Sequence, residues 1–342
     1  MREFLKCLRH NRFLIEYKLL VDLDEIEAIS SDWDQLLGRS RCNRAFSSAA
    51  WYLATCRAQP SVIPCVAIAC RDGAIAGVLP LALTPSTGEA AFPSAISNYN
   101  DLVADPLDDD VLGGLLDYAI SNPKPYVRVD LWWVRQSSNL LRAARLLHPR
   151  LDAIRCFNLV RDYSVIRLPP SYEDYLNSRS KLFRRNVRRA RRIACAAGFS
   201  VECLDPRSFP AERIPELFLS LHTARFGPKS AFLLKAEYHA FAQIALPLLF
   251  VRRQMFVLAL YRGAEIVGVD LCMAGHNSLC AWNGGYPPEM EPWSPGRLLV
   301  DEGIRLAFRW GLEEYDLLRG TQEWKLSWIN EIRKVGRIEI VV

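Results

Sequence analysis

The stretch that most limits the possible folds is residues 255–286, MFVLALYRGAEIVGVDLCMAGHNSLCAWNGGY. It contains three runs rich in β-branched and other apolar residues, separated by turn signals at Arg262-Gly263 and His276-Asn277. Runs of this kind favour strands, and short turns with glycine or asparagine favour antiparallel neighbours. The segment therefore predicts a three-stranded antiparallel meander.

Helices and further strands are predicted on both sides of the meander. The residue patterns indicate helices near 211–225, 235–250, 295–310 and 321–332, and strands at 199–204, 314–318 and 337–342. Strands before and after helices, around a central meander, indicate an α/β unit with a mixed, mostly antiparallel sheet flanked by helices.

The first half of the chain repeats this order at a smaller scale. The pattern predicts an extended segment at 13–21, a hairpin at 64–83, a helix near 108–121, a strand at 126–134, a helix at 138–147 and strands near 154–168. At 342 residues, the chain also exceeds the size at which single hydrophobic cores stop growing. We therefore expect two units, residues 1–167 and 168–342, with the boundary near 165–170.

The segment RSKLFRRNVRRARR, residues 179–192, carries eight positive charges and no carboxylate. Without them the formal net charge of +5 becomes −3, so the basic character of the chain is concentrated here. Apolar residues at helical spacing predict a helix from about 172 to 197 that packs by one side and ends at Gly198. Like charges at i, i+4 cost about 0.2–0.5 kcal/mol per pair. Carboxylates of the chain or a ligand phosphate are expected to offset this cost, with Arg185, Arg188 and Arg192 nearest the phosphate.

A second anion-binding candidate is the tetrapeptide SPGR at residues 294–297. Ser294 is a good N-cap, and proline is favoured at the first helical position that follows. Gly296 leaves the backbone uncovered at the start of the predicted helix, and Arg297 adds a positive charge. A strand followed by such a helix start suits a pyrophosphate, although helix starts of this composition are also common without any ligand.

Asp316, Lys325 and His222 are candidates for proton transfer or charge stabilisation. Asp316 lies in a predicted strand, and the helix predicted after it places Trp324 and Trp328 on one face. Each candidate also has an ordinary structural interpretation: a hydrogen-bonded strand carboxylate, a surface lysine and a structural histidine. The ten cysteines and five histidines show no zinc-ligand spacing, so we expect no metal site.

The ordered motifs resemble a known domain family. YLNSRSKLFRRNVRRARRIACAAGFSVE, LHTARFG, WNGGYPPE, WSPGRLL and YDLLRGTQEWKLSW follow one another as in the BioF2/CelD-like acetyltransferase domain. That domain is a branch of the GNAT superfamily and is related to the Fem-type aminoacyl transferases. The first half, with FSSAAWYLA and SNYNDLVADP, is similar to the degenerate N-terminal GNAT unit of these proteins.

The resemblance implies a GNAT fold used twice. A thioester would lie between two splayed strands, residues 278–286 and 314–318, and the coenzyme A pyrophosphate on the loop and helix start containing Tyr286, Ser294, Gly296 and Arg297. Backbone N–H groups from Asn283 to Tyr286 would polarise the acyl carbonyl, Lys325 matches the lysine of the family's Tyr-Lys motif, and Trp324 would contact the acceptor. Two departures stand out: the superfamily phosphate loop is replaced by SPGR, and Pro287-Pro288 stands in a motif that usually reads Tyr-Asp-Pro-Glu.

The function implied is transfer of an acyl group, from acyl-CoA as co-substrate, to an amine or hydroxyl of an anionic acceptor such as a glycan, peptide or lipid-linked molecule. The proton acceptor stays open among Asp316, His222 and water. A Fem-like transferase using charged tRNA and a non-catalytic anion-binding module are the alternatives. We expect no permanently bound cofactor and a cytoplasmic location, because the longest apolar run, residues 244–251, is too short for a membrane span.

Overall fold

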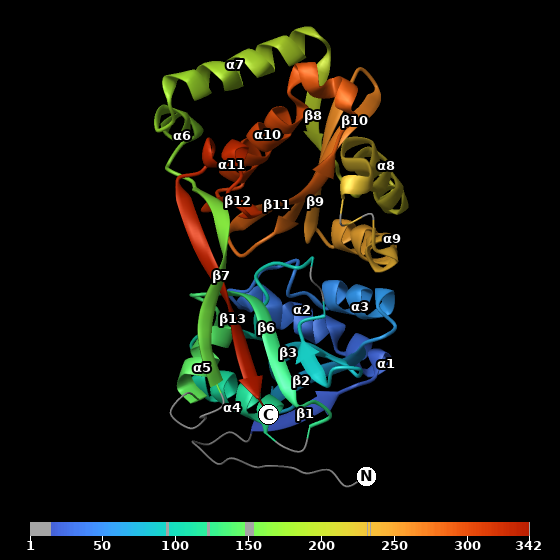
Figure 1. The fold of residues 1–342 in the computed structure, drawn as a ribbon, viewed down its shortest axis with the longest axis vertical. Helices are drawn as coiled ribbons and strands as arrows, with labels where there is room; N and C mark the ends of the chain where they lie inside the picture. Colours follow the sequence, from blue (N-terminus) through green and yellow to red (C-terminus); the bar gives the residue numbers. More distant parts are fainter. Residues whose placement is uncertain are drawn as a thin grey trace. The chain divides into compact units, whose positions relative to one another are not determined.

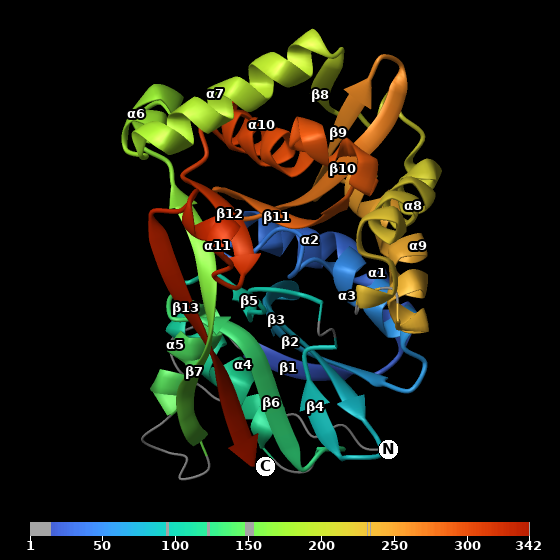
Figure 2. The same cartoon turned by 45° about the horizontal axis from the view of Figure 1, so that its top comes forward.

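The computed structural model describes residues 15–93, 96–121, 124–147, 154–230, 232 and 234–341, without the side chains of 154–157. The chain forms two compact units, drawn in Figures 1 and 2. Unit 1 contains the residues up to Arg161 and those from Lys334 onward, and unit 2 is Asp162–Arg333. Two of the residues predicted to be extended, 13 and 14, lie outside the described part.

Unit 2 is built on the predicted meander. Its sheet has the strand order β7-β12-β11-β10-β9-β8. The strands are β7 (Ile154–Arg167, which begins in unit 1), β8 (Phe199–Cys203), β9 (Met255–Arg262), β10 (Glu265–Ala274), β11 (Ser278–Gly285) and β12 (Glu314–Arg319). All neighbours are antiparallel except β11 and β12, which are parallel.

Helices cover both faces of this sheet (Figure 1). The helices are α6 (Tyr172–Asn177), α7 (Lys181–Ala196), α8 (Ile214–Phe226), α9 (Ala236–Val251), α10 (Pro295–Arg309) and the single turn α11 (Glu323–Leu326). Buried residues of α7 and α10, including Phe183, Val187 and Ile304, share one core with the sheet. On the other face, Phe218 of α8 and Phe241 of α9 contact Trp282 of β11.

Two predicted helices of unit 2 differ from the structure. The arginine-rich helix is divided, because Ser180 caps a new helix by accepting a hydrogen bond from Phe183 N, and α7 begins there. The helix predicted at 321–332 is wrong: only α11 forms, and the last strand already begins at Glu331. Trp324 and Trp328 consequently do not share a face, since their exposed fractions are 51% and 3%.

Unit 1 has a sheet of strand order β1-β2-β3-β4-β6-β13, and β5 pairs with β3. Its strands are β1 (Ile15–Leu20), β2 (Ile63–Arg71), β3 (Ala74–Thr84), β4 (Glu89–Ala91), β5 (Val103–Ala104), β6 (Arg128–Arg135) and most of β13 (Glu331–Val341). Its helices are α1 (Leu23–Ala28), α2 (Ser30–Arg39), α3 (Ala49–Ala58), α4 (Asp109–Ile120) and α5 (Asn139–Leu147). The last strand was expected in the 168–342 domain, but residues 335–341 pair with β6, and Ile338 and Ile340 are buried in the core of unit 1.

The two units share a distinctive arrangement of strands. Each contains one parallel pair, β4–β6 in unit 1 and β11–β12 in unit 2, and the register of each pair covers three residues. The last paired residue of the second strand is a buried aspartate, Asp130 or Asp316. An arginine of β13 lies close to each carboxyl, Arg337 at 2.5 Å and Arg333 at 3.8 Å. The predicted fold class, two α/β units with mostly antiparallel sheets flanked by helices, is therefore confirmed.

Gly285 lies where α8 crosses β11, and an alanine there is expected to destabilise unit 2. Its Cβ would lie 2.4 Å from His222 N and 2.5 Å from Leu221 O, which are backbone atoms that cannot rotate away. We expect Gly285→Ala to lower the free energy of unfolding by about 1–3 kcal/mol, the usual cost of overpacking.

Gly113→Ala in α4 is the matched control, because its Cβ would meet Leu146 Cδ1 at an ordinary 3.6 Å. Alanine is favoured over glycine inside a helix by about 1 kcal/mol. Urea denaturation of both variants measures the difference. Equal stability of the two would contradict a rigid contact between α8 and β11.

Candidate functional site

The candidate site is the place where β11 and β12 part. Their parallel register ends at Cys280 and Asp316. Beyond that pair, β12 is irregular: Leu318 has a φ of +59°, and the register with β7 shifts between Asp316 and Arg319. The following residues of β11, up to Gly285, lead through a short 3₁₀ segment (Pro288–Trp293) into α10. Beyond Cys280, the backbone groups of β11 are therefore no longer paired with β12, and the chain leads from this strand edge to the start of α10.

Asp316 and Lys325 hold the irregular part of β12 in place. The exposed fraction of Asp316 is 1%, and its Oδ1 accepts a hydrogen bond of 2.7 Å from Leu318 N. Lys325 is buried, and its Nζ donates to Leu317 O at 2.7 Å and to Arg319 O at 2.6 Å. Burial lowers the pKa of the Lys325 ammonium to about 8, against the opposing effect of the Asp316 charge. The geometry thus gives both residues a positioning role, and the surface interpretation of Lys325 is wrong.

His222 connects α8 to the free part of β11. Its Nδ1 lies 2.9 Å from Gly284 O, and its Nε2 lies 2.7 Å from Ser230 Oγ. Because a carbonyl oxygen only accepts, Nδ1 carries the proton, and Nε2 accepts from the Ser230 hydroxyl. Burial among aromatic rings lowers the pKa of His222, and the hydrogen bond to Gly284 O opposes this shift. His222 is therefore a neutral imidazole with a fixed tautomer. Ser230 belongs to no motif in the sequence, so its contact with His222 was not predicted.

Asp270 of β10 is a second residue that the motifs did not identify. It pairs in register with Gly284, and a Cβ on Gly284 would lie 3.2 Å from Asp270 Oδ1. Because Gly284 has no side chain, the Asp270 carboxyl can lie against the backbone of β11. The strands β10 and β11 are about 5 Å apart, so the carboxyl is near the edge of β11 that faces away from β10. The residue as a whole is partly exposed, but its carboxyl is buried, and Cys272 Sγ donates a hydrogen bond of 3.9 Å to its Oδ2. Burial raises the pKa of this carboxyl to about 7.

The start of α10 brings together Tyr286, Ser294, Gly296 and Arg297. Ser294 precedes the helix with a left-handed φ of +56°, and its side chain makes no capping hydrogen bond, so the expectation of an ordinary N-cap is wrong. Its carbonyl accepts from Arg297 N at 3.0 Å. Leu298 N also donates to Ser294 O, at 3.2 Å, and Pro295 has no N–H, so Gly296 N–H is the helical donor that this start offers to a ligand. A Cβ on Gly296 would lie 3.6 Å from the Tyr286 ring, so this ring lies beside the helix start.

A guanidinium from α8 supplements the charge of Arg297. Arg225 lies 4.4 Å from the centre of the Tyr286 ring and forms an ion pair with Glu291. The start of α10, the Tyr286 hydroxyl and the Arg225 guanidinium with its partner Glu291 lie close together, and Arg297 follows Gly296 in the first turn of the helix. These are the groups that a pyrophosphate requires.

The arginines of α7 lie elsewhere in unit 2. Arg185, Arg188 and Arg192 are exposed on the side of α7 opposite its buried residues. Arg191 points inward and lies 3.4 Å from the buried Asp301 of α10. Beside Arg191 and Arg192 is a groove of about 440 Å³, and Asp301 and Glu302 also line it. Two carboxylates make this groove unsuitable for a phosphate, so the outward face of α7 is the better anion surface.

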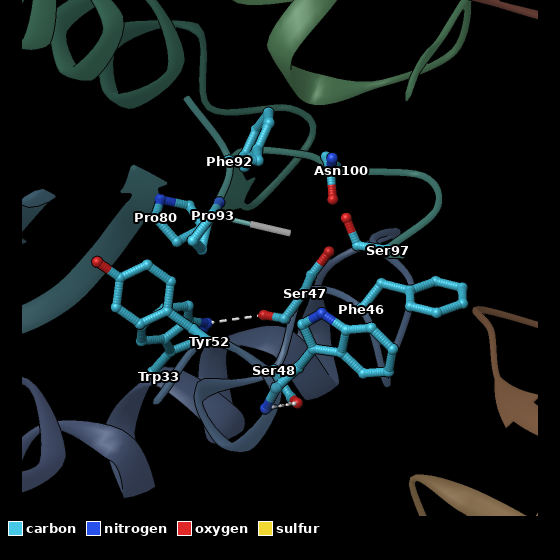
Figure 3. Close-up of a pocket in the computed structure, with 11 residues that line it drawn as sticks. Trp33, Phe46, Ser47, Ser48, Tyr52, Pro80, Phe92, Pro93, Ser97 and Asn100 are labelled. Atoms are coloured by element: carbon cyan, nitrogen blue, oxygen red, sulfur yellow. Dashed lines mark hydrogen bonds between the residues drawn. The ribbon is translucent and has the colours of Figure 1, made fainter. Parts of the chain in front are cut away.

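The corresponding opening in unit 1 is filled by the chain itself. Asn100 Nδ2 donates a hydrogen bond of 3.0 Å to Trp132 O of β6, two residues beyond the last β4–β6 pair. The neighbouring cavity, shown in Figure 3, has a volume of about 20 Å³. It has room for about one water molecule, which could satisfy the buried Ser47 Oγ that lacks a hydrogen-bond partner. Unit 1 thus keeps the strand arrangement, and the cavity that its described residues line beside Asn100 is too small for an extended ligand.

Replacing Lys325 by methionine is expected to destabilise the protein by about 1–3 kcal/mol at pH 9.5, where the amine is neutral and still donates, because two buried carbonyl oxygens lose their donor. The pH dependence is a second readout. In the folded protein the ammonium loses its proton near pH 8, whereas a free lysine does so near 10.4. The unfolded state then binds more protons, so this group makes stability rise from about pH 8 to pH 10.

Lys325→Met should lack this rise, and Lys334→Met, at an exposed position of β13, should keep it. Denaturation with urea at pH 7.5, 8.5 and 9.5 measures both quantities. A variant as stable as the wild type would rule out the positioning role.

Comparison with known proteins finds one family model that matches part of the chain. Residues 181–326 match the family model described as acetyltransferase (GNAT) domain. No curated protein sequence matches the chain.

Solved structures resemble the whole chain at low sequence identity. A structure of FemX is 13% identical, with 95% of this chain and 97% of that chain covered and a TM-score of 0.64. L-PGS from Bacillus licheniformis is 12% identical, with 91% and 90% covered and a TM-score of 0.60. These likenesses establish the fold. Residues 181–326 thus match a GNAT-type acetyltransferase domain, in agreement with the family that the sequence motifs resemble.

Proposed function

We propose that unit 2 transfers an acyl group from acyl-CoA to an amine or hydroxyl of an anionic acceptor. The observation that carries this proposal is the parting of the parallel strands β11 and β12 directly before the uncovered start of α10. An extended thioester could lie along the free edge of β11, with its phosphates at Gly296 N–H, Arg297 and Arg225. The GNAT family match over residues 181–326 supports the same reading.

The chemistry proposed is direct transfer. The acceptor nitrogen or oxygen attacks the thioester carbonyl, the carbon–sulfur bond breaks, and coenzyme A leaves as a thiolate. Backbone N–H groups near Asn283 to Tyr286 would stabilise the oxyanion. Gly284 N already donates to Asn283 Oδ1 at 3.0 Å, so Gly285 and Tyr286 are the better donors.

Asp270 is our candidate for the group that takes the acceptor proton. Asp316 is buried and already accepts from Leu318 N, and both ring nitrogens of His222 are engaged. The Asp270 carboxyl lies beside Gly284, and a pKa of about 7 suits a general base at neutral pH. His222, through Gly284 O and Ser230, would hold β11 in position.

A transferase that uses charged tRNA is the second candidate. The Fem-type enzymes that the sequence resembles use such donors, and the basic face of α7 favours a polyanionic partner. The two candidates predict different ligands for the start of α10, since only the first places a pyrophosphate there.

Donor binding is tested by thermal denaturation with acetyl-CoA, longer acyl-CoAs and charged tRNA. A ligand at 100 times its dissociation constant stabilises by about 2.7 kcal/mol. We expect this gain with an acyl-CoA for the wild type and not for Gly296→Glu, because a carboxylate at the helix start repels the pyrophosphate. Gly38→Glu in α2, where a Cβ meets nothing within 4 Å, is the control. Stabilisation of Gly296→Glu equal to that of the wild type would remove the pyrophosphate assignment.

Asp270→Asn is expected to abolish turnover and to stabilise the fold. A buried carboxyl with a raised pKa costs stability where it is ionised, so this cost appears as pH rises from about 4 to about 7. The variant should therefore melt higher than the wild type at pH 8, with little difference at pH 4. Acyl transfer to a panel of phosphorylated amines and sugars measures turnover. An active Asp270→Asn variant would exclude Asp270 as the base.

A further inference from the structure

The outward face of α7 carries a row of cations. Five are exposed there: Lys181, Arg185, Arg188, Arg189 and Arg192. The opposite side of the helix, with Phe183, Val187 and Ala194, is buried against unit 2. The row is therefore fixed in orientation by packing, and its charges point away from the core.

These cations have few carboxylate partners. Many arginines elsewhere in the described chain have a carboxylate within 4 Å, as Arg71 has Asp108 and Arg337 has Asp130. On the outward face of α7, Arg188 has the one ion pair found among the described residues, with the exposed Glu173 at 3.8 Å. Carboxylates of the chain thus do not neutralise this face.

The length of the row indicates the kind of anion. Lys181 and Arg192 are three helical turns apart, which corresponds to about 16 Å at 1.5 Å per residue. One phosphate or pyrophosphate contacts cations within a single turn. A row of this length suits an extended anionic surface instead.

Two exposed apolar side chains lie along the same helix. Leu182 is 57% exposed and Ile193 is 39% exposed. They are eleven residues apart and therefore lie in one line, next to the line of Arg185 and Arg189. Apolar side chains beside cations suit a lipid interface, where they enter the headgroup region, and gain nothing against a nucleic-acid backbone.

We propose that the outward face of α7 binds the surface of an anionic phospholipid bilayer. The arginines and Lys181 contact the lipid phosphates, and Leu182 and Ile193 enter the interface. Within the described residues, no helix has both the length and the apolar character needed to cross a membrane. The contact is therefore peripheral, and it does not depend on the acyl-transfer chemistry proposed above.

The test is co-sedimentation with vesicles of phosphatidylcholine alone or with phosphatidylglycerol added. The wild type is expected to bind the anionic vesicles, less tightly at high salt, and to leave neutral vesicles unbound. Arg185→Gln/Arg189→Gln/Arg192→Gln should weaken binding on the order of a hundredfold. A control with the same change in charge on other exposed positions, Arg207→Gln/Lys235→Gln/Arg252→Gln, should bind like the wild type.

The apolar contribution and the competing partner are tested with the same vesicles. Leu182→Ser/Ile193→Ser should weaken vesicle binding and leave its salt dependence unchanged. Circular dichroism checks that α7 stays folded, which glutamine favours because like-charge repulsion falls. Equal binding of the α7 and control triple variants, binding to neutral vesicles, or binding to tRNA without binding to anionic vesicles would each overturn the proposal.

Discussion

The hydrogen bonds from the Lys325 ammonium to Leu317 O and Arg319 O hold unit 2 in the shape on which its site depends. A regular strand at this point would continue to pair with β11 and would close the opening. The left-handed Leu318 instead turns β12 away, and Asp316 satisfies the freed Leu318 N. Burying an ammonium group costs free energy unless its N–H groups donate hydrogen bonds, and here the ammonium donates to two carbonyl oxygens. The opening is thus maintained by a buried charge.

The same strand geometry has a different result in unit 1. Asp130 takes the place of Asp316 and is held by Arg337 and by Trp132 Nε1 at 2.7 Å. The chain after β4 then folds back, and Asp101 accepts from Leu140 N and Asn139 N at the start of α5. These bonds anchor the segment that fills the opening. The same strand arrangement is therefore closely packed in unit 1 and forms a candidate site in unit 2.

Much of the fold could be predicted from the sequence because the relevant signals are local. The meander and the hairpin at 63–84 follow from turn residues such as Asp72 and Gly73, which both adopt positive φ. The motif SPGR predicted the start of α10, because proline at the first helical position is also a local signal. The pairing of β13 with β6 could not be predicted, because it joins segments about two hundred residues apart and no local pattern specifies a distant partner.

The site was predicted less well, since function there depends on burial. Lys325 was a candidate for charge stabilisation with a surface lysine as the alternative, because its local pattern does not show that its amine is buried. Asp270, our proposed general base, was overlooked because it stands in an apolar strand as a single polar residue, and the sequence does not show that a glycine lies opposite it. Periodicity identifies which face of an element is apolar. It does not identify which polar group remains accessible in the finished packing.

The position of β13 also affects how the protein is made. Residues 334–341 follow all of unit 2 in the chain, yet Ile338 and Ile340 complete the core of unit 1. During synthesis, the edge of β6 that pairs with β13 stays unpaired until unit 2 has been translated, because β13 comes last in the chain. A nascent chain in this state exposes strand backbone to other chains, so chaperone binding during translation is expected to concentrate on the first half.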